Sequence, residues 1–321
     1  MRPLKTVIIG LGNIGMQSDL YLPAEEYTYT HARAFQQHPA FELIAGIDDN
    51  KNNCLLYQQH FPGKAYQTID EQIAQLQPDV IAISVPSAAH YSTLSKLLKI
   101  WKPKIILCEK PLSHDLLEAK KIVRICNKNK IQLYVNYVRR ADIATEKIKE
   151  LIHQQVIPLP IKGIVWYSKG LIHNGSHFLD LLRYWLGPVK SFKKISEGEL
   201  IEGDSQPDVL ITFSGGQCYF IAAKEEDYSH YTIELISSEG RIRYDHGGEQ
   251  VVWQPKVSSK HFQGYQYLSK KYETIETNMN NIQWYVAEQL YLAAQHHENS
   301  LCTGEEALQG LKTLVSIGNQ R

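Results

Sequence analysis

The sequence predicts a two-domain α/β protein, with an N-terminal doubly wound parallel sheet and a C-terminal α+β domain built on a mostly antiparallel, open sheet. Its 321 residues fit two domains at roughly 150 residues each. From Lys5 to Asn136, short β-branched runs alternate with amphipathic stretches, which is typical of a parallel sheet covered by helices on both faces. Beyond Asn136, closely spaced alternating runs separated by glycine turns indicate antiparallel strands.

The N-terminal part contains five expected strands joined by helices through right-handed crossovers. The expected strands are Thr6–Ile9, Glu42–Ile47, Val80–Val85, Lys104–Cys108 and Ile131–Val135. The expected helices are Lys51–His60, Tyr91–Ile100 and Asp115–Asn127.

The C-terminal part begins with helix, strand, helix and continues as a run of strands. The expected helices are Asp142–Gln154, Asn174–Trp185, Ile282–His296 and Glu305–Ser316, the last announced by a Thr303-x-x-Glu306 capping box. The expected strands are Ile161–Tyr167, Val209–Phe213, Gln217–Ala222, Thr232–Ser237, Ile242–Tyr244 and Gln250–Trp253. The boundary falls near residues 137–141, so the predicted domains are 1–137 and 138–321.

Composition indicates an ordinary globular enzyme. The 34 Lys+Arg balance 34 Asp+Glu, which leaves no basic field for nucleic acid or an anionic membrane. Five scattered cysteines form neither a metal-binding CxxC pair nor a dense disulfide scaffold, as expected in a reducing cytoplasm. The early apolar run Val7–Leu11 is too short for a membrane span and reads as a buried strand. We therefore expect a soluble, cytoplasmic protein with no nucleic-acid or membrane partner.

A glycine motif follows the first expected strand. Gly10, Gly12 and Gly15, with Asn13 and Ile14 between them, match the Rossmann dinucleotide fingerprint. In that fingerprint the glycines give a tight turn, close approach to pyrophosphate and close packing. The hexapeptide alone is a weak signal, because any strand-to-helix turn can carry such glycines. Its position at the start of a βαβ pattern favours the dinucleotide interpretation.

An acidic residue, Asp48, ends the second expected strand, where it suits the adenosine ribose hydroxyls. Asp48-Asp49 would repel a 2′-phosphate, so the expected cofactor is NAD, with NADP less favoured, although nearby Lys51 weakens that preference. In the alternative interpretation, Asp48 is a solvated acid in a loop and does not contact a cofactor. The spacing from the glycines exceeds the usual one, and an insertion around Gln17–Tyr29 that contains Pro23 accounts for the excess.

Several further motifs stand in a recognisable order. The chain resembles the Gfo/Idh/MocA oxidoreductases, and the motifs that carry this resemblance are Gly10–Gly15, Val85-Pro86 with His90, Cys108-Glu109-Lys110-Pro111, Asn136–Arg140 and His173–Asp180. The resemblance spans nearly the whole chain, although its specific motifs stop near Gly187. Each motif is modest by itself, and their order makes them specific.

The resemblance implies hydride transfer between nicotinamide and a secondary alcohol or ketone of a sugar, polyol or nucleotide sugar. It implies cofactor binding by Gly10, Gly12, Asn13, Ile14, Gly15, Asp48, Ser84, Pro86, His90, Glu109, Lys110 and Arg139. It implies substrate binding by Lys110, Tyr137, Arg140, Asn174 and His177. By the same analogy, Pro111 follows a cis peptide.

Oxidising an alcohol needs a base for the hydroxyl proton and a positive charge near the developing alkoxide. Lys110 suits the role of the positive charge. His177 suits the role of the base, because it stands in the first turn of its expected helix, where the positive helix end disfavours imidazolium. An apolar stripe occupies one face of that helix, and the polar residues of another face are His173, His177 and Asp180. The base is therefore expected to point away from the core.

His173 departs from the family pattern, which most often has Asp there. A second imidazole can orient His177 but stabilises its protonated form poorly, so His173 is a third catalytic candidate with a less secure role. His173, His177 and Asp180 could alternatively ligate zinc, although the expected chemistry needs no metal and none is predicted.

Two alternatives stay open, and one further expectation concerns assembly. In one interpretation Arg139 and Arg140 bind a phosphate or carboxylate of a ligand. In the other they are solvated surface charges. The leading hypothesis for the whole protein is an enzyme. The alternative is a catalytically idle NAD-binding regulator of the same fold. The expected sheet, covered by helices on one face only, leaves its other face for a homodimer or homotetramer contact.

Overall fold

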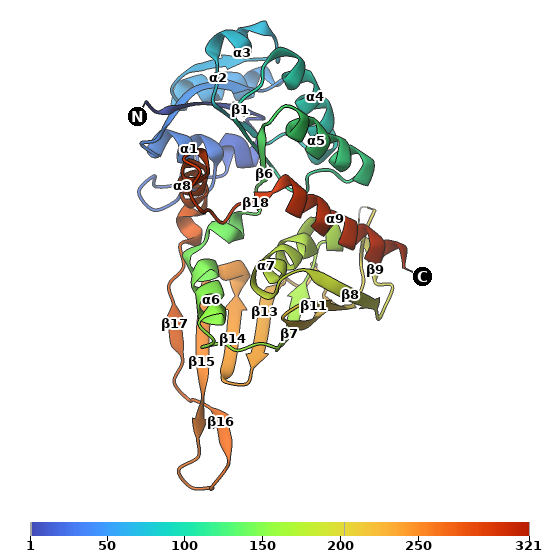
Figure 1. Cartoon of the computed structure of the whole chain (residues 1–321). Helices are drawn as coiled ribbons and strands as arrows, with labels where there is room; N and C mark the ends of the chain where they lie inside the picture. Colours follow the sequence, from blue (N-terminus) through green and yellow to red (C-terminus); the bar gives the residue numbers. More distant parts are fainter. Residues whose placement is uncertain (1, 202, 321) are drawn as a thin grey trace. The chain divides into compact units, whose positions relative to one another are not determined.

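A computed structural model describes residues 2–201 and 203–320 (Figure 1). The chain forms two compact units, one of residues 1–141 and 280–309, the other of residues 142–279 and 310–321. The first unit thus includes residues 280–309, which the predicted boundary near residue 137 places in the second domain. The functional division into domains 1–137 and 138–321 stays a prediction.

The first unit contains a seven-stranded sheet of order β18-β6-β5-β4-β1-β2-β3. All its neighbours pair in parallel except β18, which runs antiparallel to β6. The strands are β1 (Leu4–Ile9), β2 (Phe41–Ile47), β3 (Lys64–Tyr66), β4 (Val80–Ile83), β5 (Ile105–Cys108), β6 (Gln132–Val135) and β18 (Cys302–Thr303). The predicted doubly wound parallel sheet is confirmed, and β3 and β18, which are too short for a periodicity signal, were not predicted.

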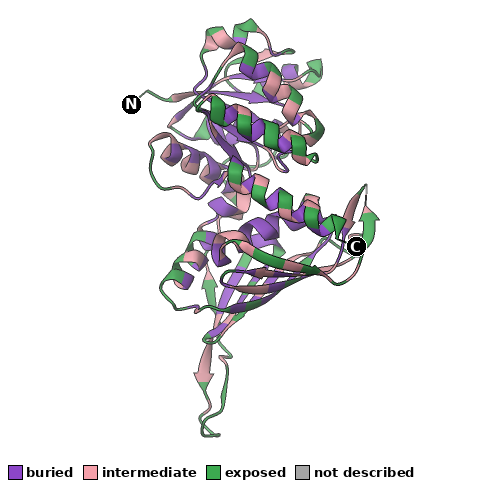
Figure 2. Ribbon diagram, turned by 45° about the vertical axis from the view of Figure 1, so that its right-hand side comes forward, coloured by how far each residue is buried: buried purple, intermediate pink, exposed green. Residues whose placement is uncertain are grey.

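The helices of the first unit are α1 (His31–Gln37), α2 (Lys51–His60), α3 (Glu71–Leu76), α4 (His90–Ile100), α5 (Leu116–Lys128) and α8 (Ile282–Ala294), with shorter turns η1 (Asn13–Gln17), η2 (Ser87–Ala89), η3 (Val138–Ala141) and η6 (Met279–Asn281). They include four that the sequence predicts, namely α2, α4, α5 and α8. Several of these helices have a side-chain N-cap. In α5, for example, the Asp115 carboxylate accepts from the N–H groups of Leu117 and Glu118. In Figure 2 the central strands are buried and the outward helix faces exposed.

The insertion predicted after the glycine motif is an ordered, non-helical excursion. The fully buried Asp19 carboxylate accepts from the N–H groups of Tyr29 and Thr30 and from the Thr30 hydroxyl. Thr30 then caps α1 by accepting from the Arg33 N–H. Thr28 pairs through its backbone with Asn280 and Gln283 at the start of α8, which explains why this late helix belongs to the first unit.

The second unit contains a nine-stranded sheet of order β16-β15-β14-β13-β7-β12-β11-β8, with β17 also pairing β15. Only β7 and β12 pair in parallel, so the predicted mostly antiparallel sheet is confirmed. The strands are β7 (Ile161–Tyr167), β8 (Val189–Lys194), β11 (Val209–Phe213), β12 (Gly216–Ala222), β13 (Tyr231–Ser237), β14 (Gly240–Asp245), β15 (Gln250–Ser258), β16 (Gln266–Leu268) and β17 (Glu273–Ile275). A separate ribbon joins β9 (Glu199–Ile201) and β10 (Asp204–Gln206).

Helices α6 (Ile143–His153) and α7 (Ser176–Leu186) follow the predicted pattern, with turns η4 (Leu171–Gly175) and η5 (His246–Gly248) between other elements. Helix α9 (Gly304–Asn319) begins in the first unit and ends in the second. Phe178, Leu181 and Trp185 of α7 share a hydrophobic core with Val165 of β7 and Phe220 of β12. None of the helices formed by the described residues combines the length and apolar character that crossing a membrane requires.

The other face of this sheet carries large side chains that α6 and α7 do not cover. On β7 buried and exposed residues alternate strictly, as expected for a strand with one solvated face. Ile164, Trp166 and Tyr219 are each at least 40% exposed, and Ile164 is the register partner of Tyr219. The expectation that this face joins subunits into a homodimer or homotetramer stays a prediction.

Candidate functional site

Two of the three motif glycines are required by the fold. Gly10 follows β1 with a φ of +97°, and a Cβ there would lie 2.6 Å from the Ser84 backbone. A Cβ on Gly15 would lie 2.0 Å from the Gly10 carbonyl oxygen. Gly12 differs, because a Cβ there would meet nothing within 4 Å. The backbone at Gly12 therefore borders open space, which suits close approach of a dinucleotide pyrophosphate.

The neighbours of this loop hold it in place. The Asp48 carboxylate, at the end of β2, accepts from the Leu11 N–H at 2.7 Å and from the Asn50 N–H at 2.9 Å. The Ser84 hydroxyl donates to the Gly10 carbonyl at 2.7 Å. The motif leads into the five-residue turn η1 rather than directly into a long helix. Asn13 and Ile14 of this turn are exposed beside Gly12, so the residues present fit a dinucleotide.

A mostly buried carboxylate, Glu109, follows β5 and joins three segments, and its side chain is 14% exposed. Its Oε1 lies 2.9 Å from His31 Nε2 at the start of α1, and the Asn136 amide donates to the same oxygen at 2.6 Å from the end of β6. His31 and Asn136 are nearly inaccessible. Burial acts to raise the pKa of Glu109, but the contacts with His31 and Asn136 and the charge of Lys110 outweigh it and lower that pKa.

Lys110 follows Glu109, and the Lys110–Pro111 peptide is cis, as the resemblance implies. Burial lowers the pKa of Lys110, the Glu109 charge partly offsets this, and the Arg139 charge lowers it further. Lys110 and Arg139 thus act electrostatically on each other at the carboxyl ends of β5 and β6. Ligands of doubly wound sheets bind outside these strand ends.

His90, which the resemblance assigns to the cofactor, begins α4 after β4 and contacts two loops of the protein. It is fully buried, with Nδ1 3.2 Å from the Leu112 carbonyl and Nε2 3.0 Å from the Val85 carbonyl. Burial lowers its pKa. Both ring nitrogens face protein carbonyls, so these contacts support a bridge between two loops rather than direct cofactor binding. Pro86, on the Val85 loop, is exposed.

Arg140 and Tyr137 are buried in the first unit. The Arg140 guanidinium donates to Glu306 at 3.2 Å, and the Glu306 carboxylate also accepts from the Thr303 N–H at 2.9 Å in the predicted capping box. This ion pair gives Arg140 a structural partner that the predicted substrate-binding role did not include.

In the second unit, His173 and Asn174 lie in turn η4 before α7. The expected helix start at Asn174 moves to Ser176, because a wider π-helical turn from Gly170, whose φ is +85°, precedes α7. The face that His173 was expected to share with His177 stays a prediction. The Asn174 amide donates to the Tyr231 hydroxyl at 2.8 Å. The Asp204 carboxylate accepts from the backbone N–H of His173 at 2.8 Å.

His177 is the second residue of α7 and so lies in its first turn, as predicted. It stands outside the hydrophobic core cluster but is only 7% exposed, and Asp180 is 4% exposed. The expectation that the base points away from the core therefore needs correction, because this side of α7 is buried too. Within residues 2–201 and 203–320, no group of three His, Cys, Asp or Glu side chains is arranged to hold a metal ion.

Sequence reasoning missed His31, the partner role of Asn136, and Asp204. The role of His31 could not be predicted, because the inserted segment separates helix α1, which begins with His31, from the glycine motif. Asp204 lies in the three-residue strand β10, about thirty residues from the turn that it supports. A Cβ on Gly170 would lie 2.2 Å from Asp204 Oδ2, so Gly170 was the one available signal.

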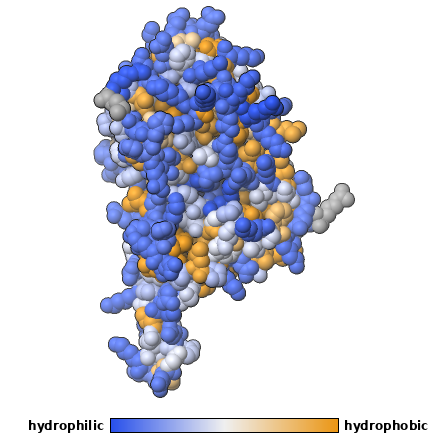
Figure 3. All heavy atoms as spheres, in the orientation of Figure 1, coloured by the Kyte–Doolittle hydropathy of each residue, from blue (hydrophilic) through white to orange (hydrophobic). Residues whose placement is uncertain are grey.

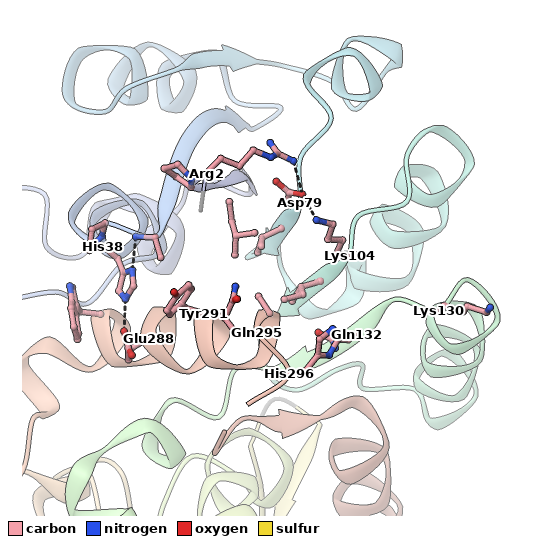
Figure 4. Close-up of a pocket in the computed structure, with 18 residues that line it drawn as sticks. Arg2, His38, Asp79, Lys104, Lys130, Gln132, Glu288, Tyr291, Gln295 and His296 are labelled. Carbon is pink, nitrogen blue, oxygen red and sulfur yellow. Dashed lines mark hydrogen bonds and ion pairs between the residues drawn. The ribbon is translucent and has the colours of Figure 1, made fainter. Parts of the chain in front are cut away.

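A cavity of about 850 Å³ lies at the opposite, amino ends of β1, β4, β5 and β6, beside α8 (Figure 4). Its buried polar groups already have partners. The Asp79 carboxylate accepts from Arg2 at 3.3 Å and Lys104 at 3.0 Å, and His38 lies 2.8 Å from Glu288. It also lies away from the glycine loop, so we do not assign it as the active site.

The glycine loop, the acid after β2 and the Glu109-Lys110-Pro111 segment stand where a Rossmann domain binds a dinucleotide. Residues 4–137 match the family model described as "Oxidoreductase family, NAD-binding Rossmann fold". The resemblance to the Gfo/Idh/MocA oxidoreductases is confirmed over this region of the chain.

The chain is 26% identical over 229 residues to a D-xylose 1-dehydrogenase [NADP(+)] of Haloarcula marismortui, covering 63% of this chain and 61% of that protein. It is 29% identical over 147 residues to an uncharacterised oxidoreductase of Schizosaccharomyces pombe, covering 44% of this chain and 36% of that protein. The matches thus span less than two thirds of these relatives. The structure of an NAD binding oxidoreductase from Klebsiella pneumoniae shares the fold, with a TM-score of 0.79, 17% identity and coverage of 99% and 98% of the two chains.

The different environments of the glycines give a matched pair of variants. Gly12→Val places its side chain in open space, so we expect a folded protein whose dinucleotide affinity falls at least about tenfold. Gly15→Ala forces a backbone clash, so we expect a lower melting temperature. Calorimetric titration and thermal unfolding measure the two effects. Unchanged NAD affinity in a folded Gly12→Val protein would remove the loop from the cofactor site.

Proposed function

We propose that the protein is an NAD-dependent oxidoreductase that transfers hydride between nicotinamide and a secondary alcohol or ketone of a sugar, polyol or nucleotide sugar. The observation that carries this proposal is Lys110, whose pKa is lowered by burial and whose charge is supported by Glu109 at the carboxyl end of β5. A partly desolvated ammonium at this place suits an oxygen that becomes negative during reaction.

Lys110 would donate a hydrogen bond to the substrate oxygen and favour its alkoxide. His177 would take the hydroxyl proton at a ring nitrogen, for which its place in the first turn of α7 supports a neutral imidazole. A bound nicotinamide would supply the hydride acceptor, or in the reverse direction the hydride donor, for the substrate carbon. Asn174, held by Tyr231, would contact the substrate, and Tyr137 would line its site. His173 would orient His177 or the substrate.

The substrate class comes from the family resemblance and from the relative named as a D-xylose 1-dehydrogenase. The proposed cofactor residues are Gly10, Gly12, Asn13, Ile14, Gly15, Asp48, Ser84, Pro86, Glu109, Lys110 and Arg139. Most act through the loop that they form: Ser84 through its hydrogen bond to Gly10, and Glu109 through Lys110. Arg139 suits a phosphate or carboxylate near Lys110.

The acids after β2 predict the cofactor preference. Asp48 and Asp49 would repel a 2′-phosphate, so the protein should bind NAD at least about tenfold more tightly than NADP, or roughly 1.4 kcal/mol. Calorimetric titration of both dinucleotides under the same salt conditions measures this difference. Equal affinities, or tighter NADP binding, would show that the acids do not select the cofactor.

The proposed chemistry assigns separate tasks to two side chains. Lys110→Ala and His177→Ala should each lower kcat about a hundredfold or more while NAD still binds, because one loses the charge near the alkoxide and the other the base. Lys102→Ala and His153→Ala change exposed residues of the same types and should leave kcat unchanged. Turnover is followed as nicotinamide reduction across free and nucleotide-linked sugars.

Near-normal turnover in either variant overturns the role of that residue. A protein that binds NAD but turns over none of a broad sugar and polyol panel would instead favour the catalytically idle regulator.

A further inference from the structure

The cavity at the amino ends of the first unit's strands, here called the amino-end cavity, has the size of a small-molecule site (Figure 4). Its volume of about 850 Å³ lies within the usual range of about 300–1,000 Å³. Every residue that lines it belongs to the first unit. The six residues of β1 separate it from the glycine loop by about 20 Å, at roughly 3.3 Å per residue. A ligand bound here is therefore distinct from a dinucleotide at that loop.

One wall of the amino-end cavity combines two aromatic rings with a carboxylate. Helix α8 contributes Trp284, Glu288 and Tyr291, and this spacing of four and three residues places them on one helix face. The ring of His38 lies 4.9 Å from that of Trp284 and 6.2 Å from that of Tyr291, between centroids. A carboxylate between two aromatic rings suits an ammonium group, because both its charge and the ring faces attract a cation.

His38 fixes this carboxylate in place. The Ala40 N–H donates to His38 Nδ1 at 3.2 Å, so the ring hydrogen is on Nε2, which donates to Glu288 Oε2 at 2.8 Å. The other carboxylate oxygen, Oε1, accepts no hydrogen bond from the residues that the structure describes. The wall is thus held ready before a ligand arrives, which lowers the entropy lost on binding.

The opposite side of the cavity carries a small excess of positive charge. The buried Asp79 carboxylate pairs with the exposed Arg2 at 3.3 Å and the exposed Lys104 at 3.0 Å, as the dashed lines of Figure 4 show. Two cations and one anion leave a net charge of about +1, which complements a single negative charge such as a carboxylate. The cavity therefore has two poles of opposite sign.

The two poles are separated by an apolar floor. His38 precedes β2 and Asp79 precedes β4, and both strands pair with β1. Two strand spacings separate the poles by about 10 Å. The floor between them is formed by the first residues of β1, β4 and β5, which are Leu4, Val80 and Ile105. By contrast, the face of the first unit that Figure 3 shows is mostly hydrophilic, with hydrophobic atoms scattered over it.

We propose that the amino-end cavity binds an elongated zwitterion, a molecule with an ammonium group at one end, a carboxylate at the other and an apolar body between them. The ammonium lies at Glu288, between Trp284 and Tyr291. The body lies over the apolar floor, and the carboxylate lies at Lys104 and Arg2. A short zwitterion such as glycine cannot reach both poles.

A matched set of probes tests the charge pattern of the ligand. 6-Aminohexanoate has both charges, hexylamine has only the ammonium, hexanoate has only the carboxylate, and glycine has both charges without the spacing. Calorimetric titration should show 6-aminohexanoate binding at least about tenfold more tightly than each of the other three. Similar affinities for all four probes, or no saturable binding of 6-aminohexanoate, would overturn the proposal.

Variants of the two poles test where the charges are recognised. Glu288→Gln keeps an oxygen that accepts from His38 but removes the negative charge, so 6-aminohexanoate should bind no better than hexanoate does. Lys104→Gln removes an exposed charge at the other pole, so 6-aminohexanoate should lose affinity about tenfold. Glu42→Gln and Lys128→Gln change exposed residues outside the cavity and should bind normally. Thermal unfolding confirms that each variant is folded, and unchanged affinity in a folded pole variant refutes that pole.

Nuclear magnetic resonance locates the bound probe. The indole N–H resonance of Trp284, assigned by its loss in Trp284→Phe, should shift as 6-aminohexanoate is added. Saturating NAD should not displace the probe, because the glycine loop lies at the opposite edge of the sheet. An unmoved Trp284 resonance, or displacement of the probe by NAD, would place the binding elsewhere and contradict the proposal. None of these results depends on turnover or on the proposed reaction.

Discussion

The proposed catalytic end of the first unit depends on the hydrogen bonds that the mostly buried Glu109 carboxylate accepts. A carboxylate that is largely removed from water is costly unless it is paired and hydrogen-bonded. Here His31 and Asn136 supply the hydrogen bonds and Lys110 supplies the charge. Removing one partner of such a buried charge typically costs about 3–5 kcal/mol. The network therefore restrains the start of α1, the loop after β5 and the end of β6 together.

This constraint gives the excursion of residues 17–30 a structural purpose. Asp19 organises its end, Thr30 caps α1, and α1 begins with the histidine that reaches Glu109. The excursion is also tied to the start of α8 through Thr28. Segments from both ends of the chain thus support a single loop. The charge of Glu109 in turn raises the pKa of Lys110 against the effect of burial, which links the folding of the unit to the chemistry proposed for it.

The sequence predicted the long, periodic elements well, because a buried parallel strand or an amphipathic helix leaves a repeated signal. It also predicted the glycine loop and the capping box at Thr303, since each is encoded by adjacent residues. The cis peptide before Pro111 was implied by the family resemblance alone. It could not predict β3, β10 or β18, which hold two or three residues each. His31 and Asp204 were missed because they reach their partners through tertiary contacts. His90 and Arg140 were assigned to ligands by motif, whereas the structure gives both of them contacts with protein groups.

The pH dependence of turnover tests most directly whether Glu109 maintains the charge of Lys110. The alkaline limb of kcat/KM should report loss of the Lys110 proton. Glu109→Gln keeps an oxygen for His31 and Asn136 but removes the negative charge, so the limb should move to lower pH. Lys110→Arg should abolish the limb in the accessible range, because guanidinium stays protonated. A limb at the same or higher pH in Glu109→Gln would contradict the account.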